Sequence, residues 1–322
     1  MPRLGVIGTF VWDEIYGRDP RRAPVEEWGG IAYALGALDA ALPDEWQIVP
    51  LARVGEDLWA RAREYLGSLR RLAPDAEPIA VPYPNNRVRL QYYSDERRSE
   101  VLSGGVPPWP WVGLRPLLRD LDALYINFIS GFELDLETLQ LVRQHFRGPI
   151  YIDLHSLLLG VAPDGTRVPR RLANPAAWCA CADLLQVNEE EMSLMAPDPM
   201  ALAATALAEG VRCLVVTLGK RGAIYVAAPG FERLADLSTT SPARGSVGAA
   251  RTALIPAVRA AVDPGDPTGC GDVFGATYFS RLLAGDYFVD ALRAAAVAAA
   301  RNVEYRGATG LAHFLRGELL ST

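Results

Sequence analysis

Lysine is almost absent from this sequence of 322 residues. Lys220 is the only lysine, and arginine supplies the other basic side chains. Chemistry that requires a lysine, such as a Schiff base or the phosphate-binding lysine of a P-loop, therefore depends on one residue. Arg221 follows Lys220, so the Gly-Lys-Ser/Thr sequence of a P-loop is missing. This absence excludes the commonest phosphate-binding loop.

An excess of positive charge is also missing. The formal net charge is -6 and the pI is about 5.3. Proteins that bind nucleic acids usually present a basic face, so nucleic acid is not an expected partner. Binding of a nucleotide such as ATP is not excluded, because backbone N–H groups can supply the local positive field.

Paired cysteines and long apolar segments are absent as well. The four cysteines form no Cys-x-x-Cys pair and the three histidines are scattered, which disfavours a zinc site. No apolar stretch reaches transmembrane length without interruption, and no secretory segment precedes the first strand pattern. We therefore expect a cytoplasmic protein with reduced thiols and no membrane partner.

What is present is enough apolar sequence for a large core. Half of the residues are hydrophobic and 22% are charged. This composition favours one large α/β domain over residues 1–322. Short buried strands are predicted at residues 4–7 and 47–54, and a helix at 56–72.

From residue 123 onward, apolar runs alternate with helical stretches. Strands are predicted at residues 123–128, 149–154, 184–187, 213–218 and 223–227, with helices such as 136–146 and 200–208 between them. This rhythm predicts a parallel sheet covered by helices on both faces. Residues 272–305 predict two helices that break near Gly285, and residues 238–248 predict a loop.

The motif that carries the chemistry is residues 266–272, with the sequence DPTGCGD. A loop of small residues runs directly into a helix, whose first N–H groups have no internal partner and attract negative charge. Gly269, Cys270 and Gly271 are therefore candidates for an anion hole around a transferring phosphoryl group. Asp272, at the helix start, is the candidate general base for an attacking hydroxyl.

Two other interpretations apply to this motif. An Asp before a helix is often a simple N-cap residue. A Gly-x-Gly pair can also begin a dinucleotide-binding fingerprint, but Phe274 occupies the position of the third glycine, and too little chain follows for most of a Rossmann domain. We discard the fingerprint and keep the cap as an alternative.

The motif resembles the C-terminal signature of the ribokinase or PfkB family of carbohydrate kinases, which is close to Asp-Thr-Thr-Gly-Ala-Gly-Asp. Pro267 and Cys270 replace two of its residues with the spacing intact. The resemblance implies a ribokinase-like α/β fold, with a central, mostly parallel sheet between helices and a small β-sheet lid. It also implies Asp272 as catalytic base, with ATP and Mg²⁺ as cofactors, and it admits a monovalent cation.

The resemblance extends to several cofactor-binding elements. Asn188 and Glu191 match the family's Asn-x-x-Glu motif, in which the Glu organises Mg²⁺ through water. Three consecutive glutamates are equally typical of any solvated first helical turn. The other cofactor-binding candidates are Thr217, Gly219 and Gly222 in a loop between two strands, Gly307 after the last long helix, and Asn302 as an adenine contact.

The substrate half departs further from the family. Asp13 follows the first strand, where relatives place an acid that binds sugar hydroxyls, although a surface turn would also suit an Asp. Gly29 and Gly30 match the paired glycines beneath the substrate, but the asparagine expected after them is missing. His155 stands where many relatives have asparagine in an Asp-x-Asn motif. These departures leave the identity of the substrate open.

A lid is expected because ATP must be kept from hydrolysis. Residues 87–93 alternate with period two, residues 94–97 predict a turn, and 99–102 predict a returning strand. Together with a strand candidate near 11–17, segment 87–102 would form a small β-sheet over the substrate. Its exposed edge would suit a homodimer through the lid.

The favoured function is phosphorylation of a sugar or small polyol by ATP. The first alternative is a nucleoside kinase of the same fold, in which Trp12, Tyr16 or Phe132 stacks on a base. The second alternative is a non-catalytic relative that binds nucleotides or proteins. The presence of both Asp272 and Glu191 argues against it.

Overall fold

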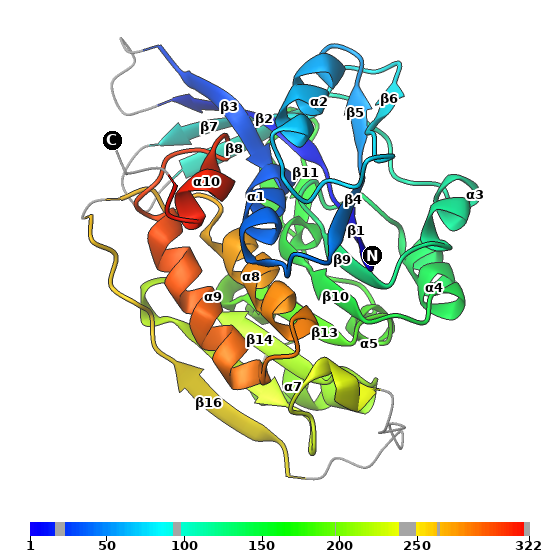
Figure 1. Cartoon of the computed structure of the whole chain (residues 1–322), viewed down its shortest axis with the longest axis vertical. Coiled ribbons are helices and arrows are strands. Elements are labelled where there is room, and N and C mark those ends of the chain that lie inside the picture. Colours follow the sequence, from blue (N-terminus) through cyan, green and yellow to red (C-terminus); the bar gives the residue numbers. More distant parts are fainter. Residues whose placement is uncertain (17–22, 93–97, 197, 238–248, 263–264, 319–322) are drawn as a thin grey trace.

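A central sheet of eight strands organises the molecule (Figure 1). The computed structural model describes residues 1–16, 23–92, 98–196, 198–237, 249–262 and 265–318, so the turn expected at 94–97 and the loop expected at 238–248 lie outside it. The strand order is β16-β15-β14-β13-β10-β9-β1-β4. Pairing is parallel from β4 to β14 and antiparallel at β15 and β16, which confirms the mostly parallel sheet. The strands are β1 (Arg3–Ile7), β4 (Gln47–Leu51), β9 (Ala123–Asn127), β10 (Ile150–Asp153), β13 (Leu184–Asn188), β14 (Cys213–Thr217), β15 (Ala223–Ala227) and β16 (Arg251–Ile255).

Helices cover both faces of this sheet, as the βαβ pattern predicted. Successive side chains of one strand point to opposite faces, so Tyr125 joins one hydrophobic core and its neighbour Ile126 joins the other. The first core includes residues of α1 (Ile31–Ala41), α2 (Trp59–Gly67), α8 (Cys270–Leu283), α9 (Phe288–Asn302) and α10 (Leu311–Leu315). The second includes residues of α3 (Trp111–Leu114), α4 (Leu136–His145), α5 (Pro175–Cys179), α6 (Glu189–Met195) and α7 (Pro199–Ala208). Short 3₁₀ segments are η1 (Arg115–Leu118), η2 (His155–Leu158), η3 (Gly219–Arg221) and η4 (Leu234–Leu237).

The structure corrects one predicted boundary, in segment 47–54, and agrees with another, at Gly285. The single strand expected at 47–54 is wrong, because the chain leaves the central sheet at Ala52. Its second half is β5 (Arg53–Gly55), which pairs with β6 (Ile79–Val81) in a separate two-stranded sheet. The two C-terminal helices are confirmed. They separate at Gly285, which has a φ of 90°.

A smaller sheet of four strands packs at one end of the molecule, and we call it the lid (Figure 1). Its order is β3-β2-β7-β8, with β3 (Val25–Gly30), β2 (Phe10–Tyr16), β7 (Arg87–Tyr92) and β8 (Arg98–Ser103). The predicted hairpin is present as the antiparallel pair β7–β8, and β2 runs parallel to β7. Strand β3 was not predicted, because its two glutamates and two glycines hide any strand pattern.

A second hairpin covers part of one lid edge. It consists of β11 (Leu159–Val161) and β12 (Arg167–Pro169), joined antiparallel. The N–H of Leu102 in β8 donates to the carbonyl of Gly165 at 2.9 Å, and Val101 forms a bridge with Thr166. At this point the β8 edge of the lid is therefore covered. Strand β3 forms the opposite edge.

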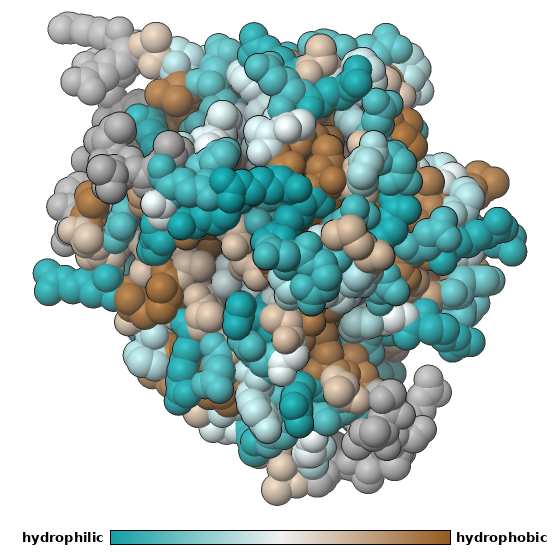
Figure 2. Space-filling model, in the orientation of Figure 1, coloured by the Kyte–Doolittle hydropathy of each residue, from teal (hydrophilic) through white to brown (hydrophobic). Residues whose placement is uncertain are grey.

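The surface is of the ordinary mixed type. Figure 2 shows small hydrophobic areas scattered among hydrophilic residues on the face in view. Within the described ranges, no helix has the length and apolarity needed to span a bilayer.

Candidate active site

The candidate site lies where the parallel strands of the central sheet end. Asn127, Asp153 and Gln186 sit side by side in register on β9, β10 and β13. All three are at most 3% exposed. They lie on the same sheet face as Tyr125 and Tyr151, whose stacked rings are 4.9 Å apart. Open α/β sheets place their ligands at this end of the strands.

Asp272 lies above this row, in the first turn of α8. It is 6% exposed, and Asn127 Nδ2 donates to its Oδ1 at 2.6 Å. Burial raises the pKa of Asp272, while nearby His155 and the bond from Asn127 oppose that rise. Gly269, not Asp272, is the N-cap residue, and α8 has no side-chain capping bond. The structure thus gives Asp272 no N-cap role.

The loop before Asp272 contains two glycines whose backbone is closely constrained or open to its surroundings. Gly269 has a φ of 75°, and a Cβ on it would lie 2.2 Å from Cδ1 of Tyr33, so glycine is needed on both counts. A Cβ on Gly271 would have no neighbour within 4 Å. Cys270 points inward, with Sγ 3.5 Å from the carbonyl oxygen of Ala299, and burial raises its pKa to about 11. Its thiol is therefore neutral at pH 7.

Two buried amides hold this loop from below. Gln186 Nε2 donates to Oδ2 of Asp153 at 2.8 Å and to the carbonyl of Gly271 at 3.0 Å. The hydroxyl of Tyr151 donates to Gln186 Oε1 at 2.7 Å, which fixes the orientation of that amide. Asn302, expected at the adenine, is fully buried and donates to the carbonyl of Thr268 at 2.8 Å. This bond supports the loop.

His155 stands among the carboxylates of the site. Burial opposes its charged form, but the carboxylates of Asp272, Glu191 and Asp153 outweigh burial and raise the pKa of His155. Its φ of 31° is rare for a residue with a side chain. Burial also raises the pKa of Asp153, and His155 partly opposes that rise. The cluster therefore combines buried carboxyl groups with one imidazole.

Glu191 closes a reciprocal capping box at the start of α6. Its N–H donates to Oδ1 of Asn188, while its carboxylate accepts from the Asn188 N–H at 2.8 Å and from Nδ2 at 2.6 Å. Glu189 and Glu190 are exposed, as in a solvated first turn, but Glu191 is only 9% exposed. Burial raises its pKa. Glu189 and Glu190 thus fit a solvated first turn, whereas the buried Glu191 does not.

The predicted nucleotide loop lies beside this cap. Thr217 at the end of β14 pairs in register with Asn188 at the end of β13. Gly219 and Gly222 have φ values of 56° and 103°, and a Cβ on Gly222 would lie 2.1 Å from the carbonyl oxygen of Ile255. Lys220 is exposed between them. The fold therefore brings the predicted elements around 188–191 and 217–222 together.

On the lid side, two carboxylates rest against glycines. A Cβ on Gly29 would lie 1.8 Å from Oδ2 of Asp13, so this glycine makes room for the buried acid. Glu27, which the sequence did not single out, pairs in register with Asp13. Its Oε2 would lie 1.6 Å from a Cβ on Gly307, and its Oε1 is buried with no hydrogen-bond partner in the part of the chain that the structure describes. Gly30 has a φ of 58° and begins α1.

The aromatic residues considered for base stacking have other neighbours. The Trp12 ring lies edge-on to Trp28 at 5.1 Å and beneath Arg61 at 4.9 Å. Arg89 covers the Tyr16 ring at 4.3 Å. Phe132 is only partly buried. The ring that does lie in the site is Tyr33, whose pKa is raised by burial and by the surrounding carboxylates Glu27, Asp266, Asp13 and Asp272.

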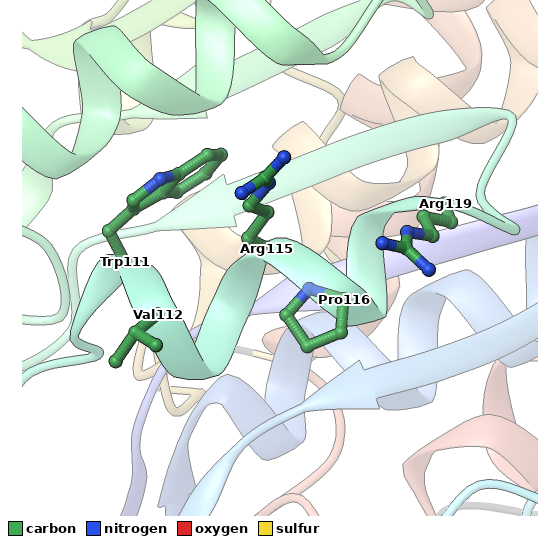
Figure 3. A pocket seen from close by; sticks show the side chains of 5 residues that line it. All are labelled: Trp111, Val112, Arg115, Pro116 and Arg119. Carbon is green, nitrogen blue, oxygen red and sulfur yellow. The ribbon is translucent and has the colours of Figure 1, made fainter.

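A surface hollow of about 310 Å³ lies on α3 and η1 and contains no predicted site residue. Figure 3 shows Trp111, Arg115 and Arg119 projecting on one side of these helices, with Val112 and Pro116 on the other. The hollow is lined by these five residues. It is separate from the candidate active site.

Comparison with known proteins confirms the resemblance. Residues 171–313 match the family model described as pfkB family carbohydrate kinase. This segment contains the elements at 188–191, 217–222 and 266–272 and the residues Asn302 and Gly307. No curated protein matches the sequence significantly.

Solved structures extend the likeness to nearly the whole chain. The Thermotoga maritima ribokinase is 18% identical, with a TM-score of 0.70 and 99% of each chain covered. The Burkholderia thailandensis nucleoside kinase in complex with inosine is 17% identical, with a TM-score of 0.70 and coverage of 96% of this chain and 94% of that one. An Arabidopsis thaliana ribokinase complexed with ribose and ATP is 18% identical, with a TM-score of 0.67 and coverage of 98% and 99%. The expected ribokinase-like fold is confirmed.

Proposed function

From a ribokinase-like fold whose residues 171–313 match the pfkB carbohydrate kinases, we propose that this chain phosphorylates a hydroxyl of a sugar or small polyol with ATP. The observation that carries the proposal is Asp272, buried in the first turn of α8, beside a glycine loop and fixed by Asn127. A base and an anion-binding helix start are the two parts that phosphoryl transfer to an alcohol requires.

The reaction follows from these parts. The acceptor hydroxyl loses its proton to Asp272 as its oxygen bonds to the γ-phosphorus, and the bond from that phosphorus to the β–γ bridging oxygen breaks. The N–H groups of Gly269 and Gly271 face the charge on the transferring group, whereas the N–H of Cys270 donates to the carbonyl of Pro267 at 3.2 Å. Asp13, Gly29 and Gly30 hold the acceptor, and the lid excludes water that would otherwise compete with it.

Mg²⁺ and nucleotide fit the residues that are present. In the described part of the chain, no cluster of three or more His, Cys, Asp or Glu side chains could hold a metal directly. The buried carboxylate of Glu191 near Asp272 is an oxygen donor that suits a hydrated Mg²⁺ carried on phosphates. When bound, the ion would neutralise phosphate charge. Thr217, Gly219, Gly222 and Gly307 would line the nucleotide side.

Nucleosides are the second acceptor class. One similar structure holds inosine, which motivates the test. The arginine-covered rings of Trp12 and Tyr16 favour sugars and polyols over a stacked base. A homodimer through the lid would use the β3 edge, because β8 already meets the second hairpin.

A panel of sugars, polyols and nucleosides tests the proposal. ADP formation with Mg·ATP is measured for each alcohol, with wild-type protein and with Asp272→Asn. We expect ADP formation that depends on one class of alcohol and is lost in the variant. ADP release that no alcohol stimulates, or that the variant retains, would refute the function.

A further inference from the structure

Three buried polar side chains lie in a row beneath α8. The row Asn127, Asp153 and Gln186 continues the sheet face of Tyr125 and Tyr151, where only apolar side chains would be expected under a helix. Placing polar groups in a core is costly unless each has a partner. Their hydrogen-bond partners are the start of α8, one another and the hydroxyl of Tyr151 on β10.

Asn127 is the member of this row that contacts the Asp272 carboxylate. It is 0% exposed, and its Nδ2 lies 2.6 Å from Asp272 Oδ1. An ionised carboxylate can only accept, so the amide must turn its nitrogen toward Asp272 and its Oδ1 away. That Oδ1 is buried and has no hydrogen-bond partner among the described residues. The amide gives up one hydrogen bond in order to hold the acid.

We propose that Asn127 is the positioning residue of the catalytic base: it holds Oδ1 of Asp272 and leaves Oδ2 to receive the proton of the acceptor. The inference rests on the proposed function. Asn127 itself touches neither nucleotide nor acceptor in this scheme. Its contribution is to keep Asp272 in one rotamer and in the ionised form, against the effect of burial.

Other charged and titratable groups face Asp272 and set the background for any titration. They come from five further elements and from α8 itself: Tyr33 of α1, Tyr125 of β9, Asp153 of β10, His155 of η2, Glu191 of α6 and Cys270 of α8. Asn127 does not titrate, and its amide donates to the Asp272 carboxylate itself. Its removal changes a hydrogen bond without changing any formal charge, which separates its effect from theirs.

The test measures the Asp272 carboxyl directly. Protein labelled with ¹³C at aspartate carboxyl carbons is titrated by NMR, and Asp272→Asn identifies the resonance. In Asn127→Leu we expect the pKa of Asp272 to rise by about one unit, because the ionised form loses its donor. When an accepted alcohol is known, the acid limb of kcat/KM should move by the same amount, with kcat reduced and the KM for alcohol retained.

Two further variants keep the inference falsifiable. If the leucine variant does not fold, Asn127→Asp replaces it, because this substitution preserves the shape of the side chain. The carboxyl introduced at position 127 and that of Asp272 should then share one proton and titrate as a pair. Asn86→Leu is the matched control: Asn86 is 2% exposed and donates to Ser130 Oγ at 3.0 Å. This control should lose stability without moving the Asp272 resonance.

The outcomes are distinct. A folded Asn127→Leu or Asn127→Asp protein in which Asp272 titrates as in wild type overturns the inference. So does an equal shift in the Asn86 control. If no alcohol is phosphorylated by wild-type protein, the proposed function fails, while the titration still decides the role of Asn127.

Discussion

At the scale of single residues, Asp272 decides whether the site is catalytic. Replacing it with asparagine keeps its size but removes the proton acceptor. We expect Asp272→Asn to reduce kcat by about 10²-fold or more, with ATP binding nearly unchanged. The measurement is alcohol-dependent ADP formation beside nucleotide binding by calorimetry. A variant with near wild-type kcat would contradict the role of Asp272.

The same substitution should stabilise the protein without ligand. Burial raises the pKa of Asp272, so the folded state binds its proton more tightly than the unfolded state does. Stability is therefore lost as pH rises from the ordinary aspartate range through the folded pKa. We expect the unfolding free energy of Asp272→Asn minus that of wild type to grow across this window. A constant difference between the two proteins from pH 4 to 8 in urea denaturation would show that the charge is not costly.

At the scale of elements, the first turn of α6 carries Glu191, the residue proposed to act on Mg²⁺. Glu191→Gln removes the negative charge, and we expect a higher Mg²⁺ concentration for half-maximal rate with little change in alcohol affinity. Glu190→Gln is the matched control, since Glu190 is exposed in the same turn. Identical Mg²⁺ titrations for the two variants would argue against the metal role of Glu191.

The elements of the central sheet could largely be predicted from the sequence, and the lid only in part. Runs such as 123–128 are apolar and clearly delimited, so these strands can be predicted from the sequence alone. Strand β3 carries Glu26, Glu27, Gly29 and Gly30, and its pairing with β2 overrides that composition. Two short strands, β11 and β12, gave no signal of their own.

The candidate site could be predicted where a motif is local and not where it depends on register. Residues 266–272 carry their chemistry in consecutive positions. Asn127 and Gln186 become meaningful only when β9, β10 and β13 align them beneath α8. A signal was present: each is a polar residue on the period-two face of an otherwise apolar strand, Asn127 at the end of β9 and Gln186 in the middle of β13. Tyr33 of α1 and Glu27 of β3 could be recognised as site residues only in the folded structure.

At the scale of the whole molecule, the lid makes contact with the body in this structure. Glu27 rests on Gly307, and β8 meets the second hairpin. We expect hydrogen exchange in β7 and β8 to slow when nucleotide and alcohol are both bound, because ligands add contacts across the site. Strong and equal protection with and without ligands would show a rigid sheet and remove the lid from the mechanism.

The hairpin of β11 and β12 also provides a place for a spectroscopic reporter. Val168 on β12 is 41% exposed, whereas three of the four native thiols are buried and burial raises the pKa of all four. A fluorophore on Val168→Cys would therefore label one position. Gly165 and Thr166 pair with β8, and η2, which directly precedes β11, places His155 among the carboxylates, so the dye sits on a hairpin that contacts the lid and continues from the site. We expect its emission to change when both substrates bind, and a dye on Val112→Cys, 80% exposed on α3, to remain constant. Equal responses from the two dyes would mean that the hairpin does not follow the lid.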